Sequence, residues 1–210
     1  MRQMIAVLSW MIGLGCTTNL AAQQVPQAWV LALGWTPQFC KRHSGSWEPQ
    51  CLDTHYWAVH GLRPDFSGAE PTQCEQGVDV TDEKLGQLMH VLPNRVTLKK
   101  IWQEHGACSG MDFEEYFLQM DRAGRRVTIP ARFAEVLESI TLPKSEVRQA
   151  FMEANPGMTR DAIRLACHRS DLEEVRICLD QDFRYRSCGI YVEEDCGNKI
   201  RLRYFRGRRR

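Results

Sequence analysis

The architecture of this chain starts from one apolar run, Ala28-Trp29-Val30-Leu31-Ala32-Leu33-Gly34-Trp35, which has the length of a buried β-strand. Thr36-Pro37 is expected to stop this strand, and a long polar loop that holds Cys40 and Cys51 is expected to follow. A second strand-like run covers residues 56–62 and is halted by Arg63-Pro64-Asp65. This part of the chain therefore predicts two strands joined by a loop.

The rest of the chain mixes helical and strand-like patterns. Apolar residues recur every three or four positions in residues 81–92, where Thr81 or Asp82 would cap a helix. Further helices are expected over residues 97–106, 112–121 and 145–155, and alternating segments at 174–180 and 200–205 predict late strands. Because the order shows no regular βαβ repetition, the pattern predicts one α+β domain.

The beginning of the chain is typical of a secretory signal. Arg2 precedes an apolar run over residues 4–14, and small residues lead to Ala22. The run is shorter than the ~20 apolar residues of a membrane span. We expect residues 1–22 to be a cleaved signal peptide and residues 23–210 to form a single periplasmic or secreted domain without a membrane anchor. A lipoprotein signal ending at Cys16 is the alternative, but Gly13 stands where a larger aliphatic residue is expected.

Cysteine usage agrees with export. Once the signal is removed, an even number of cysteines remains, and they read as a disulfide framework: Cys40, Cys51, Cys74, Cys108, Cys167, Cys178, Cys188 and Cys196. A metal site is a poor alternative because no Cys-x-x-Cys pair occurs and the histidines are not spaced as ligands beside cysteines. Spacing alone leaves the connectivity open.

The formal net charge of +1 hides a basic C-terminal tail, residues 199–210, which contains no acid. Such a tail can attract the phosphates of a polyanion. A solvated end that keeps the protein soluble is an equally good interpretation.

Two histidines stand out by their sequence context. His60 ends an apolar strand just before a glycine and a turn, and His105 ends the segment Trp102-Gln103-Glu104-His105-Gly106 close to Cys108. Side chains at strand and helix ends often form sites, and two imidazoles can serve as a base and an acid near neutral pH. Taken alone, either histidine could instead be structural.

The sequence segments around these histidines resemble the ribonuclease T2 family of secreted acid endoribonucleases. Trp57-Ala58-Val59-His60-Gly61-Leu62-Arg63-Pro64 is similar to the family's W-x-x-H-G-L-W-P signature, and Trp102-Gln103-Glu104-His105-Gly106-Ala107-Cys108 to its E-W-x-K-H-G-T-C signature. The opening segment, residues 31–40, is similar to the family's L-x-L-x-W-x-P-x-F-C entrance. The likeness is clear from about Trp29 to Phe117.

The resemblance implies a fold and a set of bridges. The fold would be α+β, with a central antiparallel sheet and packed helices. The disulfides would join Cys40 to Cys51, Cys74 to Cys108, Cys167 to Cys196 and Cys178 to Cys188, each adding roughly 2–4 kcal/mol.

The resemblance also implies a reaction. The 2′-hydroxyl of single-stranded RNA would attack its own phosphorus, with His105 as general base and His60 as general acid. The product would be a 2′,3′-cyclic phosphate, formed with low base specificity by a monomer that needs no metal and no cofactor. Tyr56 and Trp57 could stack an unpaired base, although core packing is the better interpretation of both.

Two residues depart from the family's second signature. Ile101 stands where the family has a carboxylate, and Glu104 stands where it has a lysine. Glu104 could do the carboxylate's work or simply pair with Lys100; Lys99 or Lys100 could supply the positive charge, and Arg63 could bind a phosphate oxygen. The departures predict a slower enzyme, and the alternatives are a non-catalytic relative that binds RNA or a protein, or a disulfide-rich domain with structural histidines.

Overall fold

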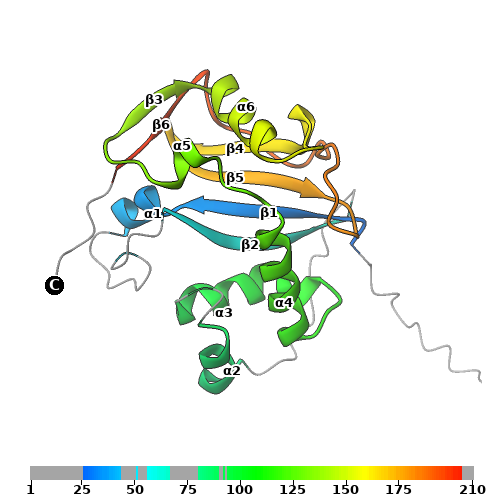
Figure 1. The fold of residues 1–210 in the computed structure, drawn as a ribbon. Coiled ribbons are helices and arrows are strands. Elements are labelled where there is room, and N and C mark those ends of the chain that lie inside the picture. The colour runs from blue at the N-terminus through cyan, green and yellow to red at the C-terminus, as the bar shows by residue number, and fades with distance from the viewer. Residues whose placement is uncertain are drawn as a thin grey trace, which may run out of the picture.

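Strands and helices are mixed around one central sheet in the computed structural model of the protein (Figure 1). The structure describes residues 26–43, 51, 56–66, 80–89, 92 and 94–204. The predicted signal peptide, Cys74 and residues 205–210 of the basic tail lie outside these residues.

Within the described residues the sheet has six strands. Five follow the order β2-β1-β5-β6-β3, and β4 lies off this path and pairs with β5. The strands are β1 (Ala28–Trp35), β2 (Trp57–Asp65), β3 (Ile140–Pro143), β4 (Ile163–His168), β5 (Asp171–Leu179) and β6 (Lys199–Leu202). All pairings are antiparallel except one parallel contact between β5 and β6. The prediction of an α+β fold with a mainly antiparallel sheet is confirmed.

Helices cover the sheet in two groups (Figure 1). They are α1 (Thr36–Arg42), α2 (Asp82–Gln87), α3 (Arg95–Glu104), α4 (Phe113–Arg125), α5 (Ala131–Ala134) and α6 (Lys144–Ala154), with short 3-10 turns at Gly106–Cys108 and Arg160–Ala162. In Figure 1, α2, α3 and α4 lie below β1 and β2, whereas α5 and α6 lie above β1 and β5, beside β3 and β6. Side chains of Asn94 and Asp112 cap the first turns of α3 and α4, which explains where these helices begin.

The core is formed by residues that alternate along the central strands. β1 is buried along its whole length, and Leu31, Leu33 and Ile177 join one hydrophobic cluster with the apolar stripe of α4. Tyr116 of α4 is fully buried, and its hydroxyl donates a hydrogen bond of 2.9 Å to the carbonyl oxygen of Leu62 in β2. This bond fixes the strand two residues beyond His60.

Several sequence-based boundaries were wrong. Thr36-Pro37 begins helix α1 instead of a loop, because proline fits the first turn of a helix, where its missing N–H is not needed. β2 continues through Pro64 to Asp65, which an edge strand tolerates. The helix expected over residues 81–92 is shorter, and strands β3 and β4 were not predicted.

Three of the implied disulfides join described cysteines: Cys40–Cys51, Cys167–Cys196 and Cys178–Cys188. Cys108 is also disulfide-bonded, while Cys74, the partner that the resemblance implies, lies outside the described residues. The bridges tie Cys51 to α1, Cys196 to β4 and Cys188 to β5.

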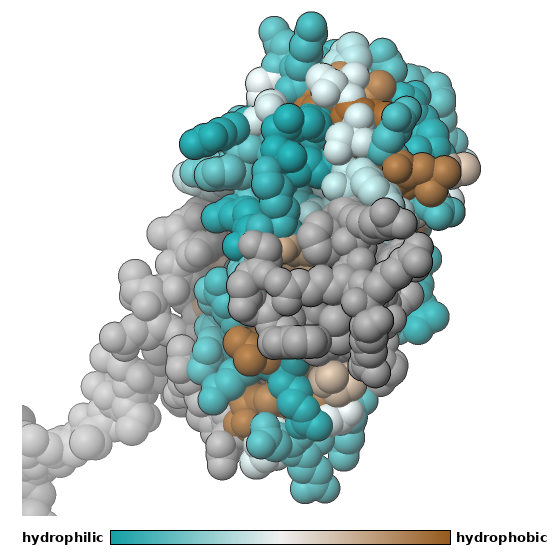
Figure 2. Space-filling model, turned by 90° about the vertical axis from the view of Figure 1, so that its left-hand side faces the viewer, coloured by the Kyte–Doolittle hydropathy of each residue, from teal (hydrophilic) through white to brown (hydrophobic). Residues whose placement is uncertain are grey.

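The basic C-terminal segment is partly anchored to the sheet by a buried aspartate. Arg201 and Arg203, from the basic C-terminal segment, both pair with Asp171 at 2.5 Å, so part of that segment belongs to the sheet. The face in Figure 2 is mainly hydrophilic in its described part, with small hydrophobic patches. Among the described residues, no helix has the length and apolar character needed to span a membrane.

Candidate active site

Both predicted histidines line one pocket of about 500 Å³. Its walls come from α1, β2, helix α3 along its length and the beginning of β5, so the pocket joins segments that are far apart in the sequence. Arg63, Lys100 and Glu104 line the same pocket. The structure therefore brings together five of the eight residues that the sequence analysis named as catalytic or substrate-binding, and Lys99 is not among the lining residues.

His60 owes its position to an irregularity in β2. The register between β1 and β2 shifts at this point, so that Gly61 pairs with Ala32 and Val59 pairs with Leu33, leaving His60 as the extra residue of a bulge. Bulges commonly redirect a side chain beside a site. The His60 ring lies over Gly34 of β1, where a Cβ atom would approach its Cε1 to 1.9 Å.

Across Gly34 the ring meets a carboxylate that the sequence analysis did not name. Gly34 pairs in register with Glu174 of β5, and Nδ1 of His60 lies 3.6 Å from Oε1 of Glu174. Arg63 Nη2 donates hydrogen bonds of 2.9 and 3.2 Å to the same carboxylate. Burial favours the neutral form of Glu174, but the His60 ring and the charges of Arg63 and Arg176 outweigh it and hold the pKa well below its ordinary value.

His105 reaches the pocket from the C-terminal end of helix α3. It ends helix α3, where its backbone N–H donates to the carbonyl of Ile101 at 2.9 Å. Its ring packs against Gly61, the residue after His60, and a Cβ there would lie 3.3 Å from the ring's Cδ2 atom. Burial lowers the pKa of His105 to about 4, and the positive charge of Arg63 adds to this effect. The ring is therefore neutral at mildly acidic and neutral pH.

This arrangement can remove one proton and donate another. A neutral imidazole such as that of His105 can accept a proton, and a second imidazole in the same pocket can exchange one with a ligand. Nε2 of His60 and Nε of Arg63 are both buried and make no hydrogen bond within the described part of the chain. Because an unpaired buried polar atom costs roughly 1–3 kcal/mol, an oxygen-rich ligand would be favourable here.

The other predicted residues divide into pocket and core. Glu104 is half exposed, and its Oε1 lies 3.6 Å from Nζ of Lys100, the i, i+4 pair that the sequence suggests. Tyr56 and Trp57 do not belong to the pocket walls described here. Both pack against the core, and Nε1 of Trp57 donates a hydrogen bond of 2.8 Å to the carbonyl oxygen of Phe133.

At the position of the family's carboxylate this chain has the apolar residue Ile101. Its side chain is 3% exposed, belongs to the hydrophobic core and also lines the pocket. The carboxylates of the pocket come from elsewhere: Glu104 on its outer wall, and Glu173 and Glu174 from β5. Glu173 is paired with Arg42 of α1.

Two pocket residues were missed by the sequence analysis. Glu174 lies in a segment that was predicted only as a strand, and its alternation with Arg176 was the available signal that both face the same side of the sheet. Phe39 was placed in a loop, but in α1 its ring packs edge-on against His60 with centroids 5.6 Å apart. Phe39 is therefore an aromatic side chain of the pocket wall that lies beside His60.

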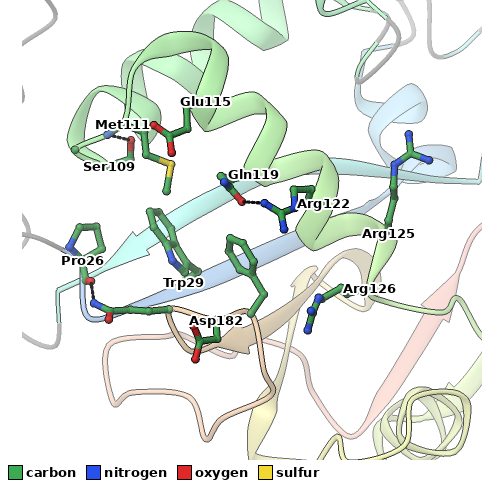
Figure 3. Close-up of a pocket in the computed structure, with 13 residues that line it drawn as sticks. Pro26, Trp29, Ser109, Met111, Glu115, Gln119, Arg122, Arg125, Arg126 and Asp182 are labelled. Atoms are coloured by element: carbon green, nitrogen blue, oxygen red, sulfur yellow. Dashed lines mark hydrogen bonds between the residues drawn. The ribbon is translucent and has the colours of Figure 1, made fainter.

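A second and larger hollow of about 840 Å³ lies between α4, the start of β1 and the loop after β5 (Figure 3). Arg122, Arg125 and Arg126 line it, together with Trp29 and Phe183. Neither His60 nor His105 lines this hollow. Among the described residues, no three His, Cys, Asp or Glu side chains are grouped as metal ligands would be.

The sequence of this chain is similar to those of known ribonucleases. The ribonuclease T2 family model matches residues 27–188. A probable ribonuclease of Haemophilus influenzae is 24% identical over 176 residues, which cover 76% of this chain and 60% of that protein. A ribonuclease of Aeromonas hydrophila is 24% identical over 163 residues, which cover 73% of this chain and 72% of that protein.

The fold also recurs in a solved structure. A variant of RNase MC1, determined in complex with 5′-UMP, has a TM-score of 0.63 and 21% sequence identity, over 84% of this chain and 98% of that chain. At this identity the likeness shows a shared fold. Because the family model spans most of the chain and the fold agrees with it, this chain belongs to the ribonuclease T2 family.

Proposed function

We propose that this chain is an exported endoribonuclease that cuts single-stranded RNA by transphosphorylation, without a metal and with low base specificity. The observation that supports this most directly is the convergence of His60 and His105 on one pocket, each in the surroundings that its role requires. The substrate supplies its own nucleophile, so the protein has only to move protons and stabilise charge.

His105, neutral because of its burial, would take the proton of the 2′-hydroxyl. His60, beside the Glu174 carboxylate, would give a proton to the leaving 5′-oxygen. The lining of the pocket contains Arg63 and Lys100 for the phosphate and Phe39 for a base. The product would be a 2′,3′-cyclic phosphate, and DNA would be spared because it lacks the nucleophile.

Residues 1–22 are proposed to be the signal peptide and residues 23–210 the mature monomeric domain. The disulfides fit an oxidising location such as the periplasm or the extracellular space.

The experiment uses the oxidised protein with single-stranded RNA and EDTA at pH 4 to 8, beside His60→Ala and His105→Ala. Cleavage that survives chelation and falls by about 10²–10⁴ in both variants is expected. RNA with 2′-O-methyl groups should remain intact, and cutting of this RNA would refute the mechanism.

One observation favours a second candidate, a non-catalytic relative that binds RNA. Ile101 replaces the family's carboxylate, and the site contains no lysine at position 104. This candidate predicts intact RNA together with a dissociation constant that rises with salt concentration.

A further inference from the structure

A buried carboxylate connects His60 to the positive charges of the pocket. The Glu174 side chain is 15% exposed and is contacted by His60 at 3.6 Å, by Arg63 at 2.9 Å and by Nε of Arg176 at 3.2 Å. A charge taken out of water costs several kcal/mol unless its partners compensate for the lost hydration. Three nitrogen-bearing side chains do so here, so the negative charge of Glu174 is the centre of this cluster.

The cluster joins strands that are not neighbours. β2 and β5 lie on opposite sides of β1, which separates them by roughly 10 Å, twice the spacing of adjacent strands. His60 can cross this distance because Gly34, the residue of β1 beneath its ring, pairs in register with Glu174. The bulge at His60, the glycine in β1 and the register of β5 thus converge on one contact.

We propose, resting on the ribonuclease function above, that Glu174 is the carboxylate of this reaction centre and positions His60 as its general acid. The α3 position of the family's carboxylate is occupied by the buried Ile101, and Glu104 pairs with Lys100 at the pocket's outer wall. Glu174 supplies the carboxylate from strand β5 instead. It is a positioning residue, because it touches His60 and Arg63 and acts on the RNA through them.

The chemical step defines what this positioning does. The ribose 2′-oxygen bonds to phosphorus while its proton passes to His105, and the bond from phosphorus to the 5′-oxygen breaks while His60 gives that oxygen a proton. The products are a 2′,3′-cyclic phosphate and a free 5′-hydroxyl. Glu174 holds the Nδ1 side of His60, which leaves Nε2, unpaired among the described residues, for the leaving oxygen.

The test compares Glu174→Gln with a matched control, Glu194→Gln. Glu194 is 20% exposed, pairs with Arg148 and Lys144, and does not line the pocket. Each variant loses one buried carboxylate charge, but only the first loses it beside His60. We would measure kcat and KM on a uridylyl dinucleotide and on uridine 3′-(4-nitrophenyl phosphate), whose nitrophenolate leaves without needing a proton.

Glu174→Gln is expected to lower kcat on the dinucleotide by about 10²-fold without raising KM. On the nitrophenyl ester its kcat should fall less than about threefold, because no acid is needed there. His60→Ala should show the same dependence on the leaving group, and His105→Ala should be slow on both substrates. Glu194→Gln should keep both rates within about twofold of the wild type.

Equal losses of Glu174→Gln on both substrates would show a merely structural role and overturn the proposal, as would unchanged rates on both. If near-UV circular dichroism shows that Glu174→Gln is unfolded, Glu174→Asp, which keeps the charge but shortens the reach, takes its place with the same expected dependence on the leaving group. A wild type that cleaves neither substrate would instead overturn the ribonuclease function itself.

Discussion

The two histidines of the pocket stand on different kinds of backbone and in opposite surroundings. His60 occupies a bulge in a strand and lies against the Glu174 carboxylate, whereas His105 ends a helix and is buried with Arg63 as its main charged neighbour. Burial beside an arginine favours the neutral form of His105, whereas the charged group beside His60 is a carboxylate. Under the proposed mechanism, this difference would suit two identical side chains to opposite halves of one proton exchange.

Both rings also rest on a glycine, but with different tolerance. A Cβ at Gly34 would come within 1.9 Å of the His60 ring, and one at Gly61 would stay 3.3 Å from the His105 ring. The first approach excludes any side chain, while the second is tight and coincides with a positive φ of 158° at Gly61, which also disfavours a side chain. Both rings therefore require a glycine beneath them, His60 through direct overlap and His105 through a tight contact and the backbone conformation of Gly61.

Gly34→Ala should have the largest effect among the changes that leave both histidines in place. The added methyl group must displace the His60 ring from Glu174, so kcat on RNA should fall by about 10²–10³-fold. Steady-state cleavage of a dinucleotide would measure it. Gly197→Ala, where a Cβ meets nothing within 4 Å, is the matched control.

A double variant sharpens this prediction. If the methyl group acts only through His60, Gly34→Ala should cause no further loss in a His60→Ala background. Additive losses would show that Gly34 serves the strand and not the acid.

Arg63→Gln should affect the surroundings of both histidines. It removes the main partner of Glu174 and the positive charge that helps to lower the pKa of His105. We expect kcat/KM to fall by about 10²-fold, because the site loses a charge that faces the phosphate. The acidic limb of the pH–rate profile should move to higher pH, and a limb that stays in place would separate Arg63 from His105.

The wild-type pH profile tests the base directly. Because the pKa of His105 is about 4 and the neutral ring is the active base, kcat/KM should rise with pH through about 4. Below that value the ring is protonated, and the rate should fall about tenfold per pH unit. An acidic limb near 6.5, the ordinary value for histidine, would show that His105 is not buried in the way described.

Much of the fold and half of the site follow from local sequence. The strands Ala28–Trp35 and Trp57–Asp65 and the helices around His105 and Tyr116 have periodic apolar residues that report burial directly. His105 could be named because it ends such an element, and His60 because it lies in one, although β2 continues past it to Asp65. The start of α1 was missed because Pro37 has the same local signal whether it ends a strand or begins a helix.

Glu174 could not be found in this way. Its importance comes from the register between β1 and β5, which sets it opposite Gly34 across some 140 positions of sequence. A glutamate alternating with apolar residues ordinarily marks the solvent face of a strand. Only the pairing of strands shows that this face is covered by a histidine and two arginines.

Glu104→Gln should have the smallest effect and separates the two carboxylates most simply. Glu104 is half exposed and pairs with Lys100 across one helical turn, a contact worth a few tenths of a kcal/mol. If Glu174 serves the reaction centre, removing the charge of Glu104 should change kcat less than about twofold and leave the melting temperature nearly unaltered. A loss of about 10²-fold would instead assign the carboxylate's work to Glu104 and to the end of helix α3, where the family keeps it.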